Sequence, residues 1–421
     1  MAGWSRWSLA AARSTASRLA CAPTAKRKAR CNVCVEPFSK RHGVHSLTTD
    51  AASAASTGIN DEIRGDSDSG HGKTSRAGDH VNVARSRSSD DASARIQPHP
   101  GDDATDLVDR LLRRTSDLMD PHAVNVVAYS GGVDSSLVAA LVHRAFADHQ
   151  TTSSSSRGSV QAVLGVSPAV PQSQIVLARE VAETIGIPLT EVATAESKDD
   201  AYRRNDGYAC YVCKTHLYST LDAVAKHVEG QRCHHDDQQP VVLYNGTNAD
   251  DREDPTRLGL LAASEFRVRS PLDRIAKEQV RRAARHLGLP NWDAAASPCL
   301  RSRLARGVRA TAAHLRAVER AEAFVRNALD LDGTVDARVR MLAGGRAMVE
   351  LDRGVLGAGA GGGADDGGGE NWATELLRER GFEERLGSWG FNSFGGVRGF
   401  KTGSVAAVPT ENSRPVVSVV S

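Results

Sequence analysis

The stretch Val124-Asn-Val-Val-Ala-Tyr-Ser130-Gly-Gly-Val-Asp-Ser-Ser136 restricts the fold of this chain more than any other segment. An apolar strand runs into a Ser/Gly turn, and Leu137, Leu141 and Phe146 then continue at helical spacing. The turn therefore lies at a helix N-terminus, where unpaired backbone N–H groups and the helix dipole attract anions. This arrangement predicts a nucleotide phosphate site.

The residue types of the turn suit that chemistry. Glycines let a phosphate approach the backbone closely, serine hydroxyls donate hydrogen bonds, and the carboxylate of Asp134 is placed to hold Mg²⁺. The spacing G-x-x-x-x-G-K-[ST] is absent, which excludes the common P-loop of ATPases and GTPases. A Ser/Gly-rich connection without a ligand is the alternative. The candidate residues are Ser130, Gly131, Gly132, Asp134, Ser135 and Ser136.

The N-terminal segment differs from the rest of the chain in charge. Residues 1–35 hold seven Arg or Lys and no acidic residue, which predicts a transit peptide over 1–50 and a location in an organelle, either mitochondrion or plastid. A disordered basic tail is the alternative. Without residues 1–50 the chain has 44 basic and 49 acidic residues, a net charge of about −5 that argues against a nucleic-acid partner. No apolar run is long enough for a membrane helix.

The remaining chain divides by composition. Residues 51–103 are polar and lack periodicity, which predicts a disordered linker. From 104 to 308, strand and helix patterns alternate, which predicts an α/β fold with a doubly wound parallel sheet. Its ligands should lie at the carboxyl ends of the strands. The predicted elements are strands at 160–166, 188–193 and 241–245, and helices at 173–185, 214–227 and 276–287.

Residues 309–406 predict a small C-terminal α+β domain. One helix precedes strands 335–342 and 346–351, which are joined by the Ala343-Gly344-Gly345 turn. A Gly-rich stretch, 354–369, predicts a flexible insertion, and a helix at 371–380 and a strand near 396–405 follow. Residues 407–421 predict a disordered tail.

Three cysteines outside the polar and basic regions suggest sulfur or metal chemistry. Cys210-Tyr-Val-Cys213 has a C-x-x-C spacing that suits zinc, a redox dithiol or an iron–sulfur cluster, and Cys299 adds a third thiol. Three thiols can hold three corners of a [4Fe–4S] cluster and leave one iron open. Arg301 and Arg303 favour thiolate over thiol at Cys299. A buried, inert Cys299 is the alternative.

With these motifs, residues 105–405 resemble the LarE family of PP-loop ATP pyrophosphatases, which are ATP-dependent sulfur transferases. The resemblance is carried by Ser130-Gly-Gly-Val-Asp-Ser-Ser136, Cys210-x-x-Cys213-Lys214, Gly246-Thr-Asn-Ala-Asp-Asp251, Arg269-Ser-Pro-Leu272, Ser297-Pro-Cys-Leu-x-Ser-Arg303 and Arg338-Val-Arg340. It implies that residues 104–308 form the PP-loop domain. It also implies that a carboxylate of a pyridinium dicarboxylate mononucleotide is adenylated by ATP with Mg²⁺, and that sulfur displaces AMP to give a thiocarboxylate of the nickel-pincer cofactor pathway.

The resemblance assigns roles to residues as well. It implies that Cys210, Cys213 and Cys299 bind a [4Fe–4S] cluster that delivers sulfide. Family members that have only the cysteine matching Cys299 give up the sulfur of that cysteine instead. Arg303, Arg338, Arg340 and Glu350 would contribute to substrate binding, and Arg338 and Arg340 alternate along one strand, where solvent-facing arginines are the alternative. Arg301 replaces a small residue of the family, and Ala209 replaces an arginine.

Other functions share parts of this pattern. A PP-loop tRNA thiolase also uses three cysteines, but the acidic balance argues against it. An ATP-dependent amide synthetase of the NAD, GMP or asparagine type would not need the three thiols. A nucleotide-binding module without turnover is the non-enzymatic alternative. The family resemblance further implies a small-molecule nucleotide substrate and a homo-oligomer.

Overall fold

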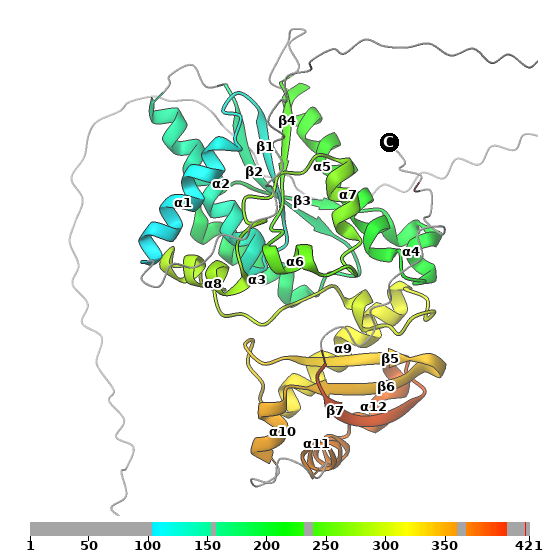
Figure 1. The fold of residues 1–421 in the computed structure, drawn as a ribbon. Helices are drawn as coiled ribbons and strands as arrows, with labels where there is room; N and C mark the ends of the chain where they lie inside the picture. Colours follow the sequence, from blue (N-terminus) through cyan, green and yellow to red (C-terminus); the bar gives the residue numbers. More distant parts are fainter. Residues whose placement is uncertain (1–102, 153–156, 231–238, 360–367, 402–416, 418–421) are drawn as a thin grey trace, which may run out of the picture. The chain divides into compact units, whose positions relative to one another are not determined.

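The computed structural model describes residues 103–152, 157–230, 239–359, 368–401 and 417 (Figure 1). The predicted transit peptide and nearly all of the linker and tail lie outside these residues. The same is true of Cys21, Cys31, Cys34 and Cys233. The predictions for these segments stay predictions.

The first sheet is parallel and has four strands, as the alternating pattern predicted. Its order is β3-β2-β1-β4, so the strand that leads to the Ser/Gly turn occupies a central position. Central parallel strands are buried on both faces, which matches the continuous apolar run before Ser130. The strands are β1 (Val124–Tyr129), β2 (Ser159–Val166), β3 (Leu189–Ala193) and β4 (Val241–Tyr244).

Helices cover both faces of this sheet (Figure 1). Side chains alternate along β1, so Val127 and Tyr129 pack in one hydrophobic cluster and Val124 and Val126 in another. The first cluster contains residues of α1 (Ala104–Asp117), α2 (Val133–Thr152), α3 (Gln172–Ile185) and α8 (Lys277–His286). The second contains residues of α5 (Ala209–Gly230) and α7 (Gly259–Glu265). The predicted doubly wound α/β architecture is confirmed.

Helix α5 begins earlier than the sequence pattern indicated. It starts at Ala209 rather than at 214, so Cys210 and Cys213 both lie in its first turns. Cysteine, tyrosine and valine have modest helix propensity, but Ala209 and Val212 are fully buried, and this packing outweighs local preference. Short helices α4 (Asp200–Arg204) and α6 (Ala249–Glu253) also escaped prediction.

A second sheet has three strands in the order β5-β6-β7. Strands β5 (Ala337–Leu342) and β6 (Arg346–Leu351) are antiparallel and are joined at Ala343–Gly345, as predicted. Strand β7 (Ser393–Gly399) runs parallel to β6. The helices here are α9 (Ala312–Ala328), α10 (Arg353–Gly359), α11 (Gly368–Glu379) and α12 (Phe382–Trp389). Helix α10 therefore occupies the start of the stretch that was predicted to be a flexible insertion.

Candidate functional site

The Ser/Gly turn lies between β1 and α2. Gly131 has φ of 70°, and a Cβ there would come within 2.6 Å of Ala178 Cβ, so only glycine fits. The Ser135 hydroxyl closes the turn, because Ser130 N donates to it at 3.2 Å and it donates to Gly132 O at 3.0 Å. The predicted residues Ser130, Gly131, Gly132, Ser135 and Ser136 are thus gathered at the N-terminus of a 20-residue helix.

Two side-chain amides from distant segments hold this turn. Gln174 Nε2 donates to Ser130 O at 2.9 Å, and Asn291 Nδ2 donates to Gly131 O at 2.8 Å and to Ser136 Oγ at 3.0 Å. Both amides are buried. Sequence reasoning missed them because no local motif distinguishes a buried Asn or Gln from a surface one.

Asp134 faces two further residues that were not predicted as site residues. Asn248 Nδ2 donates to its Oδ1 at 3.0 Å, and Lys277 Nζ forms an ion pair with its Oδ2. Asn248 lies in the Gly246–Asp251 motif, and a Cβ on Gly246 would lie 2.7 Å from Ser135 N. The motif after β4 therefore packs directly on the Ser/Gly turn. We call this turn, Ser130–Ser136, the phosphate turn after its predicted ligand. Mg²⁺ needs only one or two carboxylates besides phosphate oxygens, so Asp134 fits that role.

The three predicted cysteines lie near one another. Cys210 and Cys213 are three residues apart on α5, and Cys299 immediately precedes the short turn Leu300–Arg303. All three are free thiols and are partly buried. Burial raises the pKa of Cys213 to about 12; Lys214 opposes this shift, while the charges of Cys299 and Cys210 add to it.

Arg301 contacts the Cys210 thiol. Its Nη2 donates to Cys210 Sγ at 3.0 Å, and its Nη1 donates to Asn205 Oδ1 at 2.8 Å. Asn205 adopts φ of 53° and its amide donates to Ala305 O at 3.0 Å and Val308 O at 3.2 Å, which fixes the loop after Cys299. The residue that departs from the family pattern is therefore built into the cysteine site.

Two buried polar atoms beside the thiols have no hydrogen-bond partner among the described residues. They are Tyr202 Oη and Glu196 Oε2, on side chains that are 1% and 2% exposed. Burial raises the pKa of Tyr202, and the charges of Cys299 and Cys213 raise it further, so this hydroxyl lies within electrostatic reach of the thiols. Buried polar groups normally have partners, so this region suits a further bound group.

The thiols fit an iron–sulfur cluster by donor type rather than as a single-ion site. Within the described residues, no three His, Cys, Asp or Glu side chains converge on one metal position. A [4Fe–4S] cluster instead takes each thiolate on a different iron, so its ligands need not converge on one point. Three free thiols beside two unpartnered polar atoms are consistent with such a group.

The phosphate turn and the cysteines are joined by the connection from β2 to α3. Leu300 N, next to Cys299, donates to Ala169 O of this connection at 2.7 Å, and Gln174, in the first turn of α3 directly after it, donates to Ser130 O. A second link runs through Asn245, which follows β4 and donates to Tyr218 Oη of α5 at 3.1 Å. Both sites therefore lie at the carboxyl edge of the parallel sheet.

The arginines predicted for substrate binding are buried behind the Cys299 segment. Arg303 pairs with Glu322 at 2.8 Å, and Arg340 pairs with Glu350 at 2.7 Å and donates to Ser302 O at 2.6 Å. Arg338 pairs with Asp336 at 2.8 Å. Burial and, to a smaller extent, the neighbouring charge of Arg303 lower the pKa of Arg338 to about 10. Arg338 and Arg340 are 4% and 5% exposed, so they are not solvent-facing strand arginines.

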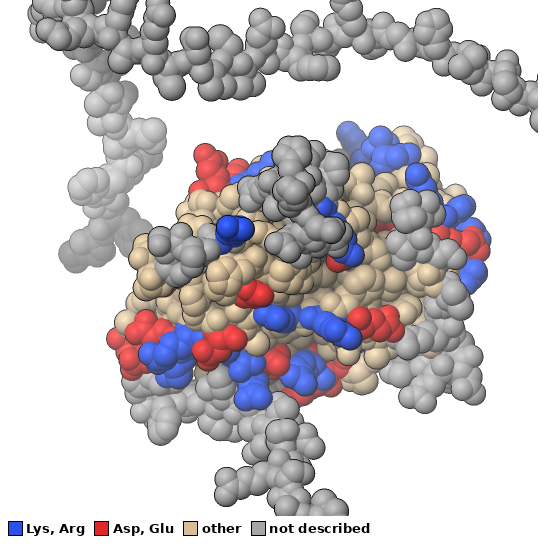
Figure 2. All heavy atoms as spheres, turned by 90° about the horizontal axis from the view of Figure 1, so that it is seen from above, with Lys and Arg blue, Asp and Glu red and all other residues tan. Residues whose placement is uncertain are grey.

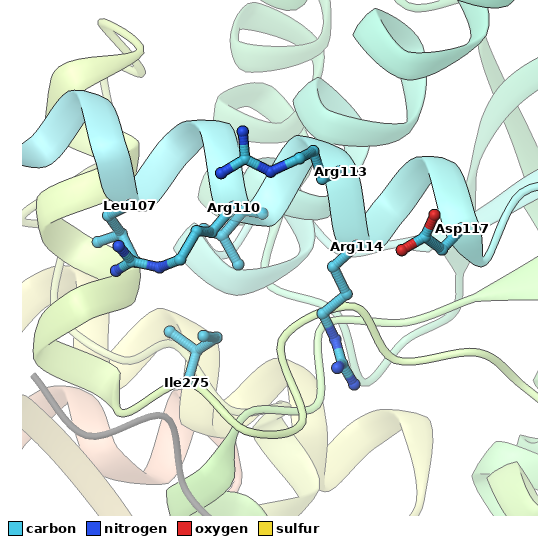
Figure 3. Close-up of a pocket in the computed structure, with 7 residues that line it drawn as sticks. Leu107, Arg110, Arg113, Arg114, Asp117 and Ile275 are labelled. Carbon is cyan, nitrogen blue, oxygen red and sulfur yellow. The ribbon is translucent and has the colours of Figure 1, made fainter.

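A cavity of about 390 Å³ lies elsewhere, along α1 (Figure 3). Leu107, Leu111 and Ile275 form its apolar wall, and Arg110, Arg113 and Arg114 line its rim. Arg114 is already bound to Pro271 O at 2.9 Å and to Asp273 at 2.5 Å. None of the predicted site residues lines this cavity, and we assign it no role in the site.

Comparison with known proteins identified two relatives. The chain is 36% identical over 210 residues to an uncharacterized protein of Synechocystis sp., which covers 48% of this chain and 68% of that protein. It is 29% identical over 203 residues to the pyridinium-3,5-bisthiocarboxylic acid mononucleotide synthase of Lactiplantibacillus plantarum, which covers 48% of this chain and 66% of the synthase. No family model matches the chain.

The predicted organellar location is wrong. Both relatives are bacterial proteins, and this finding contradicts a mitochondrial or plastid location. The prediction relied on the composition of residues 1–35 alone, and a basic Ala/Ser-rich composition is not unique to targeting segments. Among the described residues, no helix is both long and apolar enough to cross a membrane.

The identity and coverage of the relatives decide the family. A phosphate turn on a central parallel strand and three free cysteines share one sheet edge, and one of the two relatives is a named thiocarboxylate synthase. We conclude that the chain belongs to the LarE-like family.

Proposed function

We propose that the protein is an ATP-dependent sulfur transferase that adenylates a carboxylate of a pyridinium dicarboxylate mononucleotide and replaces oxygen with sulfur. The proposal is supported by the name of the Lactiplantibacillus plantarum relative. The observation that carries it is the segment formed by the β2–α3 connection and the first turn of α3, which contacts the phosphate turn through Gln174 and the Cys299 segment through Ala169. An activated carboxylate formed at one site can thus meet a sulfur donor at the other.

In the first step, a substrate carboxylate oxygen attacks the α-phosphorus of ATP and pyrophosphate leaves. The N-terminus of α2 and the hydroxyl of Ser130 would bind the phosphates, while the Ser135 hydroxyl keeps the turn closed. Asp134 would hold Mg²⁺, which supplies charge neutralisation of the departing pyrophosphate. Adenylation matters because carboxylate oxide is a poor leaving group, whereas AMP is a good one.

In the second step, sulfur attacks the acyl carbon and AMP leaves with the former carboxylate oxygen. Cys210, Cys213 and Cys299 would hold a [4Fe–4S] cluster, which supplies sulfide when bound. Arg301 keeps Cys210 in place, and Tyr202 can donate its free hydroxyl hydrogen to a sulfur or oxygen atom that arrives there. Glu196 Oε2, which also has no partner among the described residues, could accept a hydrogen bond from a donor on the bound group.

The arginines near Cys299 suit an anionic part of the substrate. Arg303 and Arg338 are buried and lie close enough for the charge of Arg303 to lower the pKa of Arg338. At about 10 this pKa still leaves Arg338 protonated at neutral pH. Each guanidinium group already pairs with a carboxylate, Glu322 for Arg303 and Asp336 for Arg338, so a substrate phosphate or carboxylate would share these donors. Arg340 and Glu350 form a separate buried pair, which we assign to the same substrate region.

The rival functions are supported less well. On the face drawn in Figure 2, Lys and Arg side chains are interspersed with Asp and Glu, a pattern that does not favour tRNA as a polyanionic partner. An amide synthetase would leave the three neighbouring thiols without a role. Assembly into a homo-oligomer stays a prediction of the family resemblance.

The decisive experiment combines anaerobic reconstitution with a product assay. We expect iron and sulfide to yield a [4Fe–4S] spectrum in the full chain and to support substrate-stimulated pyrophosphate release with thiocarboxylate formation. Cys210→Ala should lose the spectrum, whereas Ser219→Ala, on the same helix, should keep it. Absence of substrate-stimulated pyrophosphate would contradict the enzymatic function. Stoichiometric zinc without cluster formation would contradict the cluster, and dehydroalanine at Cys299 after one turnover would indicate the sacrificial route instead.

A further inference from the structure

The backbone of Lys277 is fixed by a hydrogen bond, whereas its side-chain ammonium group can move. It is the first residue of α8, and its backbone N donates to Asp250 Oδ2 at 3.0 Å. Its side chain is 35% exposed, and its ammonium group forms an ion pair with Asp134 Oδ2. The flexible four-carbon stem lets the ammonium group reach other partners while the backbone stays in place.

Both carboxylate oxygens of Asp134 therefore have a partner within the protein. Asn248 Nδ2 donates to Oδ1 at 3.0 Å, and Lys277 takes Oδ2. The two contacts differ in kind. Asn248 is neutral and buried and also caps α6, so it orients the carboxylate permanently, whereas Lys277 brings a positive charge that competes with any cation.

The charges make this pair incompatible with a metal on Asp134. A divalent cation that binds Oδ2 of Asp134 would repel and displace the ammonium group, even though Asp251 adds a second negative charge within electrostatic reach of both Lys277 and Asp134. The triphosphate of ATP, bound at the neighbouring turn, would carry more negative charge than Asp251 and could receive the ammonium group. Asp251 is already paired with Arg257 at 2.9 Å, so without nucleotide the displaced ammonium group would have to share that carboxylate, and the metal would bind less tightly.

We propose that Lys277 is a counter-ion relay: it neutralises Asp134 in the nucleotide-free protein and moves to the ATP phosphates when Mg²⁺ takes Asp134. This inference rests on the proposed ATP-dependent function. The relay makes metal and nucleotide binding mutually dependent: the metal displaces the Lys277 ammonium group from Asp134, and the nucleotide provides the phosphates that bind this group. It also keeps Asp134 from repelling an incoming triphosphate.

The test measures metal and nucleotide binding without turnover. Mn²⁺ replaces Mg²⁺ and is followed by electron paramagnetic resonance, with and without α,β-methylene-ATP, in the full chain. Lys277→Met keeps the stem but removes the charge, Lys277→Gln is a second neutral variant, and Lys277→Arg keeps the charge. Lys226→Met is the matched control, since Lys226 forms an exposed pair with Asp222 at 2.7 Å on the outside of α5.

We expect both neutral variants to bind Mn²⁺ alone several-fold more tightly than wild type and the Mn²⁺–nucleotide complex about tenfold more weakly. Lys277→Arg and Lys226→Met should resemble wild type. Weaker nucleotide binding with unchanged affinity for Mn²⁺ alone would overturn the relay and leave Lys277 as a simple phosphate ligand. Unchanged values for both would reduce it to a structural pair. Failure of wild type to bind the nucleotide at all would contradict the proposed function itself, and the relay with it.

Discussion

The phosphate turn and the cysteine site lie at the same sheet edge but differ in how completely they are built. At the turn, the carbonyl oxygens of Ser130 and Gly131 each accept an amide from a distant segment, and Asn291 Oδ1 is the exception without a partner. At the cysteines, the buried atoms Tyr202 Oη and Glu196 Oε2 have no partner among the described residues. Protein contacts therefore fix the backbone of the turn, whereas buried polar atoms at the cysteine site are left for a bound group to satisfy, as we propose.

If the two sites are separate in function, Cys299→Ala should have the largest and most selective effect. We expect thiocarboxylate formation to fall by about a thousandfold or more, because the sulfur donor is lost. Substrate-stimulated pyrophosphate release should change only a few-fold, since the phosphate turn is untouched. Parallel assays of the two products on one reconstituted sample provide the measurement. Equal loss of both products would show that the two regions act as one.

The difference between the sites also explains what the sequence could predict. The turn was predicted in full because its chemistry is local: a strand, two glycines, serines and a helix follow one another within Val124–Phe146. The two side chains that hold the turn, Gln174 and Asn291, were not predicted, because they lie 44 and 160 residues away from the atoms they contact. Lys277 was missed for the same reason, as it lies 143 residues from Asp134.

The prediction of the cysteine site depended more on family resemblance than on local chemistry. A C-x-x-C pair alone suits zinc, redox or cluster chemistry, and only the fold brings Cys299 near it. Arg301 was noted as a departure, yet its contact with Cys210 depends on Asn205, whose left-handed backbone cannot be read from its neighbours in sequence. The location was predicted from composition only and was wrong, which shows how little composition determines without a packed structure.

The next largest effect should come from Gly246→Ala. This substitution tests whether the motif after β4 packs tightly on the phosphate turn. A Cβ at Gly246 would lie 2.7 Å from Ser135 N and 2.8 Å from Asp134 C, and both are backbone atoms that cannot rotate away. We expect a loss of about 1–3 kcal/mol in the free energy of unfolding and weaker nucleotide binding. Gly333→Ala is the control, because nothing lies within 4 Å of its Cβ position. Urea unfolding of both variants decides; equal costs would refute tight packing at the turn.

Alkaline pH should expose the same rigidity. Burial raises the pKa of Tyr129, which ends β1, to about 12 from its ordinary value of 10. The unfolded chain therefore ionises first, so the stabilisation is complete below pH 10 and is lost as pH rises from 10 to 12. The slope should be about 1.4 kcal/mol per pH unit for this group, and Tyr129→Phe should reduce the total slope by that amount. Urea unfolding at several pH values in this window measures it, and an unchanged slope would contradict the prediction.

The smallest effect gives the closest comparison of the two regions, because it removes the same hydroxyl from each. Tyr129 Oη donates to Ala178 O at 2.9 Å, so Tyr129→Phe at neutral pH should cost about 1 kcal/mol in the free energy of unfolding. Tyr202 Oη has no partner among the described residues, so Tyr202→Phe should be neutral or slightly stabilising in protein without iron or substrate. Denaturant unfolding of both variants measures the difference. A cost at Tyr202 equal to that at Tyr129 would mean that its hydroxyl is already satisfied, whereas a cost that emerges only after reconstitution would locate the missing partner in the bound group.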